Sequence, residues 1–160
     1  MALEIERKFL VHHNLWHRLK KPVPVRITQA YLSKDIHKTI RVRLMGHHAF
    51  LTVKGKSEGV VRQEFEYEIP VSDARELIDL CEEPPMDKDR FRLQVGDHVW
   101  DVDVFYGANE GLILAEIELK TEDEVFEKPG WLASEVSDDI RFYNSNLAQN
   151  PFKKWRSNDF

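Results

Sequence analysis

The chain has 160 residues, of which 42% are hydrophobic and 32% are charged, and its formal net charge is −5. This size suits one domain with a real core, and no apolar run approaches the roughly twenty residues that a membrane-spanning helix needs. The acidic balance gives no support for a global nucleic-acid-binding surface, and we expect no export signal at the acidic N-terminus.

Short runs of alternating apolar and polar residues follow one another from the N-terminus to about residue 120. Such alternation predicts β-strands with two different faces, and a long series of them predicts an antiparallel sheet or barrel. Turn signals at Gly46–His48, Ser57–Gly59 and Gly96–Asp97 separate some of the runs. The predicted strands are residues 3–11, 25–33, 38–45, 49–56, 60–69, 87–95, 98–106 and 112–120.

Three segments carry helix signals instead of strand alternation. Ser72 and Asp73 can cap the first helix, and Thr121 with Glu124 has the spacing of a capping box at the start of the second. The third is broken or begun near Pro151. The predicted helices are residues 74–83, 121–127 and 144–155.

The polar face of each strand is almost entirely ionised, whereas exposed strand faces usually also contain Thr, Ser, Asn and Gln. The signs also separate: the first, seventh and eighth strands are mainly acidic, and the third, fourth and sixth are basic. Carboxylates that face one space suit divalent cations, and Lys and Arg that face the same space suit phosphates.

A closed barrel with the charged faces inward would bring both sets of charges together. The apolar faces would then point outward and need covering, although the sequence offers few helices for that purpose. Alternation alone does not say which face points inward, so a β-sandwich with a charged exterior is the competing interpretation.

The residues also resemble a known family. EIERKFLV, TIRVRL, LTVKGK, VRQEFEYEI, KDRFRL, WDVDVF and LAEIELK resemble, in order, the strand motifs of the CYTH superfamily, the triphosphate tunnel metalloenzymes, whose first motif is ExExK. EVSDDIRFYNSNLA resembles the tail of its short bacterial members. The resemblance implies a mainly β fold, an eight-stranded antiparallel closed β-barrel with a few outer helices. Residues 1–160 would form one domain, with 134–160 as a C-terminal tail or lid.

The resemblance also implies roles for the charged side chains that would face the barrel interior. The implied metal ligands, for Mg²⁺ or Mn²⁺ and two ions, are Glu4, Glu6, Glu64, Glu66, Asp103, Glu116 and Glu118. The implied substrate-binding residues are Lys8, Arg41, Arg43, Lys54, Arg62, Lys88 and Arg90. The implied catalytic residues are Glu4, Glu6, Lys8 and Lys88, which would position the attacking water or the leaving group.

The function that this resemblance implies is a metal-dependent hydrolase of inorganic tripolyphosphate. Family members also cleave thiamine triphosphate or RNA 5′-triphosphate ends, or cyclise ATP, so a nucleoside or thiamine triphosphatase and an adenylyl cyclase remain alternatives. The class IV cyclases carry extra residues before their first motif, whereas Glu4 here follows three residues, which disfavours a cyclase. A non-catalytic module that binds triphosphate or polyphosphate is the alternative of another class.

The expected partner is therefore a small triphosphate, with neither nucleic acid nor membrane involved, and the chain is expected to be a monomer or a homodimer. Cys81 is the single cysteine, so no intrachain disulfide can form. This suits a reducing compartment, and we expect a cytoplasmic protein.

Overall fold

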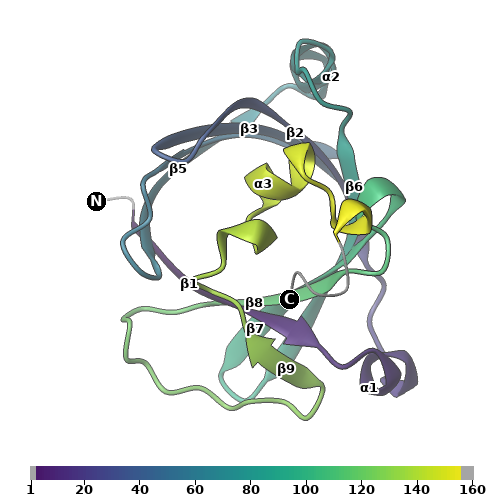
Figure 1. The fold of residues 1–160 in the computed structure, drawn as a ribbon, viewed down its shortest axis with the longest axis vertical. Helices are drawn as coiled ribbons and strands as arrows, with labels where there is room; N and C mark the ends of the chain where they lie inside the picture. The colour runs from purple at the N-terminus through teal and green to yellow at the C-terminus, as the bar shows by residue number, and fades with distance from the viewer. Residues whose placement is uncertain (1–2, 156–160) are drawn as a thin grey trace.

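The computed structural model describes residues 3–155, in which β-strands dominate (Figure 1). The strands are β1 (Leu3–Val11), β2 (Val25–Asp35), β3 (Lys38–Met45), β4 (His48–Gly55), β5 (Val61–Ile69), β6 (Met86–Val95), β7 (His98–Phe105), β8 (Ile113–Glu118) and β9 (Leu132–Glu135). The helices are α1 (His13–Arg18), α2 (Val71–Asp79) and α3 (Asn144–Gln149), with 3₁₀ turns at Gly107–Asn109, Ile140–Phe142 and Phe152–Lys154. No helix in these residues is long and apolar enough to cross a membrane.

Eight of the strands close into an antiparallel barrel, which Figure 1 shows from one end. Their hydrogen-bonded order is β5-β4-β3-β2-β6-β7-β8-β1, and residues 3–5 of β1 pair with β5 to close the ring. The predicted eight-stranded barrel is thereby confirmed, with strand ends within two residues of the predicted ones. The short strand β9 was not predicted, and it pairs with the last residues of β1.

The charged strand faces point into the barrel and the apolar faces point outward. Inside, Lys88 and Asp103 are each 1% exposed and Arg43 is 7% exposed. Outside, Trp100 and Ile117 belong to an apolar cluster that packs between the barrel wall and the segments around it. The middle of the barrel is therefore polar, and much of the hydrophobic core lies outside the ring of strands. Near the C-terminal segment the inward face becomes apolar, because Phe105 pairs with Lys88 and Leu114 lies two residues from Glu116.

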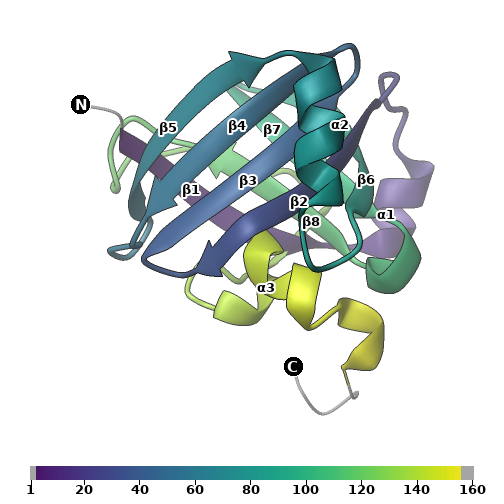
Figure 2. The same ribbon diagram turned by 90° about the horizontal axis from the view of Figure 1, so that it is seen from above.

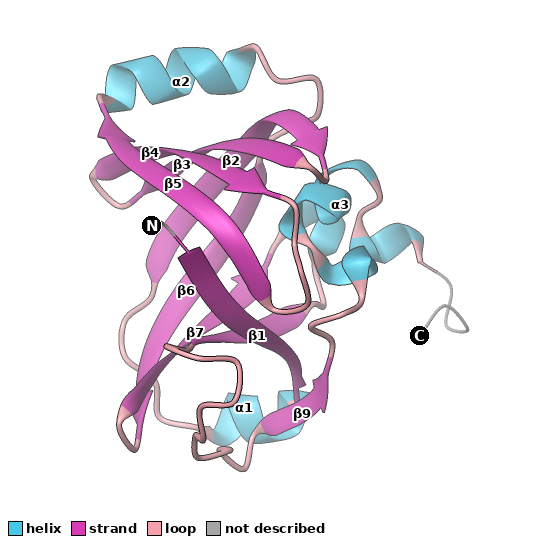
Figure 3. Ribbon diagram, turned by 90° about the vertical axis from the view of Figure 1, so that its left-hand side faces the viewer, coloured by secondary structure: helices cyan, strands magenta, loops and turns pink. Residues whose placement is uncertain are grey.

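Outer segments cover most of this apolar wall, as Figure 2 shows for α2 on the outside of β2, β3 and β4. Ile78 of α2 packs there. Figure 3 shows α1 on the side of the barrel opposite α2. Trp16 of α1 stacks edge to face on Trp131 at 5.9 Å. The outer face of β5 stays open, with Phe65 40% and Tyr67 59% exposed. The sequence predicted too few helices to cover the apolar outer wall, and the structure covers part of it with α1 and with loops instead.

The helix predicted at residues 121–127 is wrong, because this segment is a turn followed by irregular loop. Glu124 accepts a hydrogen bond from the backbone N–H of Lys120 at 2.6 Å, so its carboxylate folds back before the segment instead of capping a helix. Two residues later, Phe126 packs edge to face on Trp100 at 5.7 Å. Burial of this ring against the barrel wall outweighs the local helix signal.

The predicted start of α2 is also wrong. The helix begins at Val71 with Pro70 at the N-cap, and no side chain caps it. Ser72 and Asp73 therefore lie inside the first turn, where the carboxylate of Asp73 still interacts favourably with the helix dipole. The predicted break at Pro151 is confirmed, since it separates α3 from the last 3₁₀ turn.

The C-terminal segment, residues 136–155, lies across one end of the barrel (Figures 1 and 2). Phe142 and Leu147 of this segment pack with Phe105 and Leu114 of the strands in a second apolar cluster. The predicted tail or lid 134–160 is described only as far as residue 155, and residues 156–160 lie outside the described part of the chain.

Candidate active site

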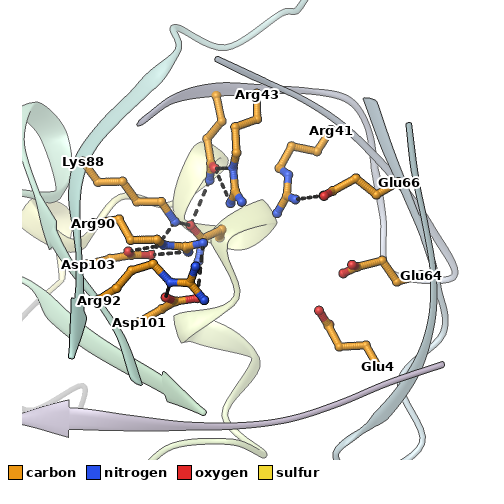
Figure 4. A network of polar contacts seen from close by, with 12 residues as sticks. Glu4, Arg41, Arg43, Glu64, Glu66, Lys88, Arg90, Arg92, Asp101 and Asp103 are labelled. Atoms are coloured by element: carbon orange, nitrogen blue, oxygen red, sulfur yellow. Dashed lines mark hydrogen bonds and ion pairs between the residues drawn. The ribbon is translucent and has the colours of Figure 1, made fainter. Parts of the chain in front are cut away.

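The inward strand faces line a cavity of about 330 Å³, seen from close by in Figure 4. All of the predicted site residues except Asp103 line it. The lining set is Glu4, Glu6, Lys8, Arg41, Arg43, Lys54, Arg62, Glu64, Glu66, Lys88, Arg90, Glu116 and Glu118. Because side chains alternate along a strand, closing the barrel brings residues from distant parts of the sequence into one space.

One side of the cavity, here called the basic side, consists of Arg41, Arg43, Lys88 and Arg90 from β3 and β6 (Figure 4). Burial lowers the pKa of Arg43 to about 9, and the neighbouring Arg41 and Arg90 add to this effect. Burial also lowers the pKa of Lys88 to about 7, against the attraction of Asp103. Both pKa values are lowered because these positive charges are buried away from water. A bound anion would stabilise the charged forms.

Asp103 is buried among these cations. Its carboxylate accepts hydrogen bonds from Arg90 Nε at 2.8 Å and Nη2 at 2.9 Å, and it pairs with Lys88 Nζ at 2.7 Å. Burial opposes ionisation, but Arg90 and Lys88 outweigh it and hold the pKa of Asp103 well below its usual range. Both of its oxygens are therefore engaged by cations, although its charge still opposes ionisation of Glu116, a predicted metal ligand on the neighbouring strand β8.

The other side, here called the carboxylate side, consists of Glu4, Glu6, Glu64, Glu116 and Glu118 from β1, β5 and β8. Glu6 stands directly opposite Glu118 in the β1–β8 ladder. Burial raises the pKa of Glu6 well above its usual range, and nearby Glu116 and Glu4 add to this. Burial raises the pKa of Glu64 to about 7, reinforced by a hydrogen bond with Glu4. Like charges this close repel unless cations enter.

Two lysines enter the carboxylate side from neighbouring strands. Lys54 Nζ pairs with Glu4 at 3.1 Å and with Glu64 at 3.2 Å. Lys8 stands opposite Glu116 in the β1–β8 ladder. Burial opposes ionisation of Glu116, but Lys8, Arg90 and Lys88 together outweigh it and its pKa falls to about 2. These two ammonium groups balance only part of the negative charge.

Arg41 has hydrogen-bonding capacity that the protein does not use. Its Nη2 donates to Thr52 Oγ1 at 3.2 Å and lies 3.6 Å from Glu66. Its buried Nε has no hydrogen-bond partner among residues 3–155. An unsatisfied buried donor costs about 1–3 kcal/mol, so an acceptor that enters the cavity would be favoured at this point. Arg62, by contrast, already donates to Thr39 Oγ1 at 2.8 Å.

The donor set of the carboxylate side fits a divalent cation. In the described residues no three Asp, Glu, His or Cys side chains are grouped as a complete metal cage. Mg²⁺ seldom needs one, because it keeps several waters and usually binds one or two carboxylates together with phosphate oxygens. Crowded glutamates with raised pKa values supply hard oxygen ligands of this kind, and they suit Mg²⁺ or Mn²⁺.

Several polar groups of the cavity were not predicted. Tyr143, Asn144 and Ser145 line it from the C-terminal segment. Lys88 and Gln29 both donate hydrogen bonds to Asn144 Oδ1. Strand alternation does place Gln29 on the inward face of β2, so this residue could have been predicted by counting alternate positions along the strand. Asn144 belongs to no strand, so strand alternation does not point to it, and the family-like tail motif that contains it gave it no role.

The model of the CYTH domain matches residues 2–144. The chain is 46% identical over 157 residues to an inorganic triphosphatase of Acetivibrio thermocellus, which covers 98% of this chain and 99% of the relative. It is 36% identical over 149 residues to an inorganic triphosphatase of Nitrosomonas europaea, covering 91% and 96%. The solved structure of the inorganic triphosphatase NE1496 superposes with a TM-score of 0.64 and 32% identity, covering 92% of this chain and 95% of that one.

Proposed function

This chain belongs to the CYTH domain family, and we propose that it is an inorganic triphosphatase that hydrolyses a terminal phosphoanhydride of tripolyphosphate inside its barrel. The relatives from Acetivibrio thermocellus and Nitrosomonas europaea are inorganic triphosphatases. The observation that carries the proposal is the cavity, in which buried Lys and Arg side chains face a cluster of crowded glutamates. This is the charge distribution that a metal-bound polyphosphate needs.

The basic side would hold the phosphates. Phosphoryl transfer needs little covalent chemistry from the protein, so positioning and charge neutralisation provide most of the catalysis. The guanidinium groups of Arg41, Arg43 and Arg90 have the planar donors that match phosphate oxygens. The unpartnered Nε of Arg41 gives one such donor directly.

Lys8 and Lys88 would neutralise charge around the reacting phosphate. Each ammonium group has three hydrogens. Lys8 uses one on the backbone oxygen of Phe142 at 3.1 Å. Lys88 uses two, on Asp103 at 2.7 Å and on Asn144 at 2.8 Å. Both therefore keep a hydrogen for a phosphate oxygen while their positions are fixed by the protein.

The carboxylate side would hold the divalent cation, with Glu4, Glu6, Glu64, Glu116 and Glu118 as the ligands that the geometry favours. Glu66 lies across from Arg41 and is a further candidate, whereas the engaged oxygens of Asp103 make it the weakest of the predicted ligands. When bound, Mg²⁺ or Mn²⁺ polarises phosphate oxygens and makes a coordinated water a better nucleophile. Glu4 and Glu6 would orient that water toward the phosphate held on the basic side.

The test is phosphate release from tripolyphosphate, ATP, thiamine triphosphate and pyrophosphate, each with Mg²⁺ or Mn²⁺. We expect tripolyphosphate to be hydrolysed fastest and EDTA to abolish the reaction. Faster turnover of ATP or thiamine triphosphate, or cyclic AMP as the main product, would overturn the substrate assignment. Tight tripolyphosphate binding without turnover would identify a binding module instead.

The remaining expectations form part of the same proposal. We place the reaction in the cytoplasm, without a nucleic-acid or membrane partner, and we treat residues 1–160 as a single catalytic domain that acts as a monomer or homodimer. Sedimentation of the purified chain with and without tripolyphosphate distinguishes the two oligomeric states.

A further inference from the structure

Asn144 is attached to the basic side although it comes from the segment that lies across the barrel end. Its Oδ1 accepts hydrogen bonds from Lys88 Nζ at 2.8 Å and from Gln29 Nε2 at 2.9 Å. Gln29 is fully buried, and its Oε1 accepts from Arg43 Nε at 2.9 Å and Nη2 at 2.8 Å. One neutral oxygen thus connects two cations of the cavity, Lys88 directly and Arg43 through Gln29.

We propose that Asn144 is a positioning residue of the triphosphate site, which orients Lys88 and, through the Gln29 amide, Arg43 toward the phosphates. The proposal rests on the function proposed above. It adds a neutral residue of the C-terminal segment to a site that is otherwise built from charged strand residues.

The first argument concerns the orientation of Gln29. An amide has a donor end and an acceptor end, and its neighbours decide which way it faces. Arg43 can only donate, so it requires the oxygen of Gln29, whereas Asn144 Oδ1 can only accept, so it requires the nitrogen. Both neighbours select the same orientation. Without Asn144, the Gln29 nitrogen would keep only the weak acceptor Met86 Sδ at 3.8 Å, so the orientation of the amide would be held less firmly.

The second argument concerns charge. Lys88 already has one carboxylate partner, Asp103, at 2.7 Å. A second carboxylate at position 144 would orient Lys88 equally well but would cancel its remaining attraction for phosphate. An amide oxygen supplies the hydrogen bond without a negative charge. The neutral side chain therefore suits a position that must orient a phosphate-binding lysine.

The third argument concerns rigidity. A residue can position another only if its own place is fixed. Leu147, in the same short helix as Asn144, is fully buried in the apolar cluster at the barrel end, and Ser145 is 6% exposed. Packing of the C-terminal segment therefore holds Asn144 in place, independently of its contacts with Lys88 and Gln29.

The test compares Asn144→Ala, Asn144→Asp and the control Asn146→Ala in the full-length chain. Asn146 lies in the same helix and donates to the backbone oxygen of Arg141 at 3.2 Å, so its loss reports on loosening of the segment. Three quantities are measured for each variant: the dissociation constant of tripolyphosphate with Ca²⁺ by calorimetry, kcat and KM for tripolyphosphate with Mg²⁺, and the thermal midpoint.

We expect Asn144→Ala to weaken tripolyphosphate binding by about tenfold, because Lys88 is no longer held toward the phosphate and one charge-assisted contact is weakened. Asn144→Asp should weaken it more, about 100-fold, yet melt no lower than the wild type because the new carboxylate pairs with Lys88. Opposite responses of binding and stability are a result that a merely structural role cannot produce. Asn146→Ala should bind tripolyphosphate within about twofold of the wild type.

A double-mutant cycle tests the connection through Gln29. If Asn144 acts on Arg43 through this amide, the effects of Asn144→Ala and Gln29→Ala on binding should be strongly non-additive. Wild-type binding by Asn144→Asp, or equal losses in Asn144→Ala and Asn146→Ala, would overturn the proposal. Wild-type protein that neither binds nor hydrolyses tripolyphosphate would instead overturn the proposed function, so the two failures are distinguishable.

Discussion

On the basic side of the cavity the buried carboxylate Asp103 is enclosed by Lys88 and Arg90, whereas on the carboxylate side Glu6 stands opposite another glutamate, Glu118. The pKa values follow this difference. Asp103 is held ionised by its cations, while burial and like charges raise the pKa of Glu6 well above its usual range. Both regions are buried and highly charged, yet Asp103 on the first is fully compensated by its cations, whereas the glutamates of the second are compensated only in part, by Lys54 and Lys8.

The difference between Asp103 and Glu6 indicates that a buried carboxylate in this barrel has one of two roles. Where arginine and lysine surround it, it orders those cations and keeps their side chains fixed for an anion. Where glutamates face one another, the missing positive charge must come from solution, which is the property of a cation site. The following predictions test this division, beginning with the largest expected effect.

Asp103→Asn should lower the free energy of unfolding by about 3–5 kcal/mol, because it leaves Lys88 buried without a counter-ion and Arg90 with only Asp101, at 3.7 Å. Chemical denaturation measures this. The control is Asp89→Asn on the outer face of the barrel, where Asp89 pairs with the largely exposed Arg26, and the expected loss there is about 1 kcal/mol or less. An Asp103→Asn variant that is as stable as this control but requires more metal for activity would make Asp103 a metal ligand after all.

Tripolyphosphate with Ca²⁺ should stabilise the protein by about 2.7 kcal/mol at a hundred times its dissociation constant, because it supplies charge to both sides of the cavity. For a chain of this size the thermal midpoint should rise by about 5–10 °C. Thermal melts with tripolyphosphate, pyrophosphate and phosphate, each with and without Ca²⁺, measure the effect. Pyrophosphate should contact fewer basic residues and stabilise less, and equal shifts with simple phosphate at the same ionic strength would argue against a triphosphate site.

Arg43→Ala should weaken tripolyphosphate binding by about 1.5–3 kcal/mol, the net value of a hydrogen bond to a charged group. Metal affinity should change little, since Arg43 belongs to the basic side. Calorimetric titrations with tripolyphosphate and with metal separate the two effects. Arg26→Ala, which removes an exposed arginine from the outside of β2, is the matched control and should bind normally.

Glu118→Gln should have the smallest effect on stability, with the free energy of unfolding unchanged or raised by less than about 1 kcal/mol, because it relieves repulsion with Glu6. Activity should nevertheless fall, and excess Mn²⁺ should restore part of it. Turnover measured against Mn²⁺ concentration tests this. The control is Glu82→Gln, at a carboxylate that is 90% exposed and does not line the cavity, and its activity should not depend on added Mn²⁺. Identical metal titrations for the two variants would contradict separate roles for the two sides.

The strands and the set of inward side chains could be predicted from the sequence, because alternation is a local property of extended backbone. Every strand of the closed barrel was found, and the faces that alternate with Ile40, Val42 and Leu44 on β3 carry the lining residues Arg41 and Arg43. Alternation did not decide which face points inward. The family resemblance suggested the answer, and the structure confirmed it through the burial of the charged set.

The local pattern failed where distant packing competed with it. Residues 121–127 have a capping-box pattern, yet Phe126 packs against Trp100 of the barrel wall and the segment is an irregular loop. Likewise, α2 begins before its apparent capping residues, because the chain turns directly from the end of β5 at Ile69 through Pro70 into the helix. Propensity is a weak preference, and burial of a large ring or the geometry of a connection overrides it.

The two sides of the cavity also differ in whether their residue pairs could be predicted from the sequence. The two-residue turn at Gly96–Asp97, with Gly96 at φ 60°, fixes the β6–β7 register, and this places Arg90 opposite Asp103 by counting along the hairpin. Glu6 and Glu118 are separated by more than a hundred residues, so no turn sets their pairing, and only closure of the barrel brings them face to face. Asn144 reaches Lys88 only because the C-terminal segment packs across the barrel end. A short turn transmits register along the chain, whereas contacts between distant segments depend on which surfaces bury one another, and that is decided by the fold as a whole.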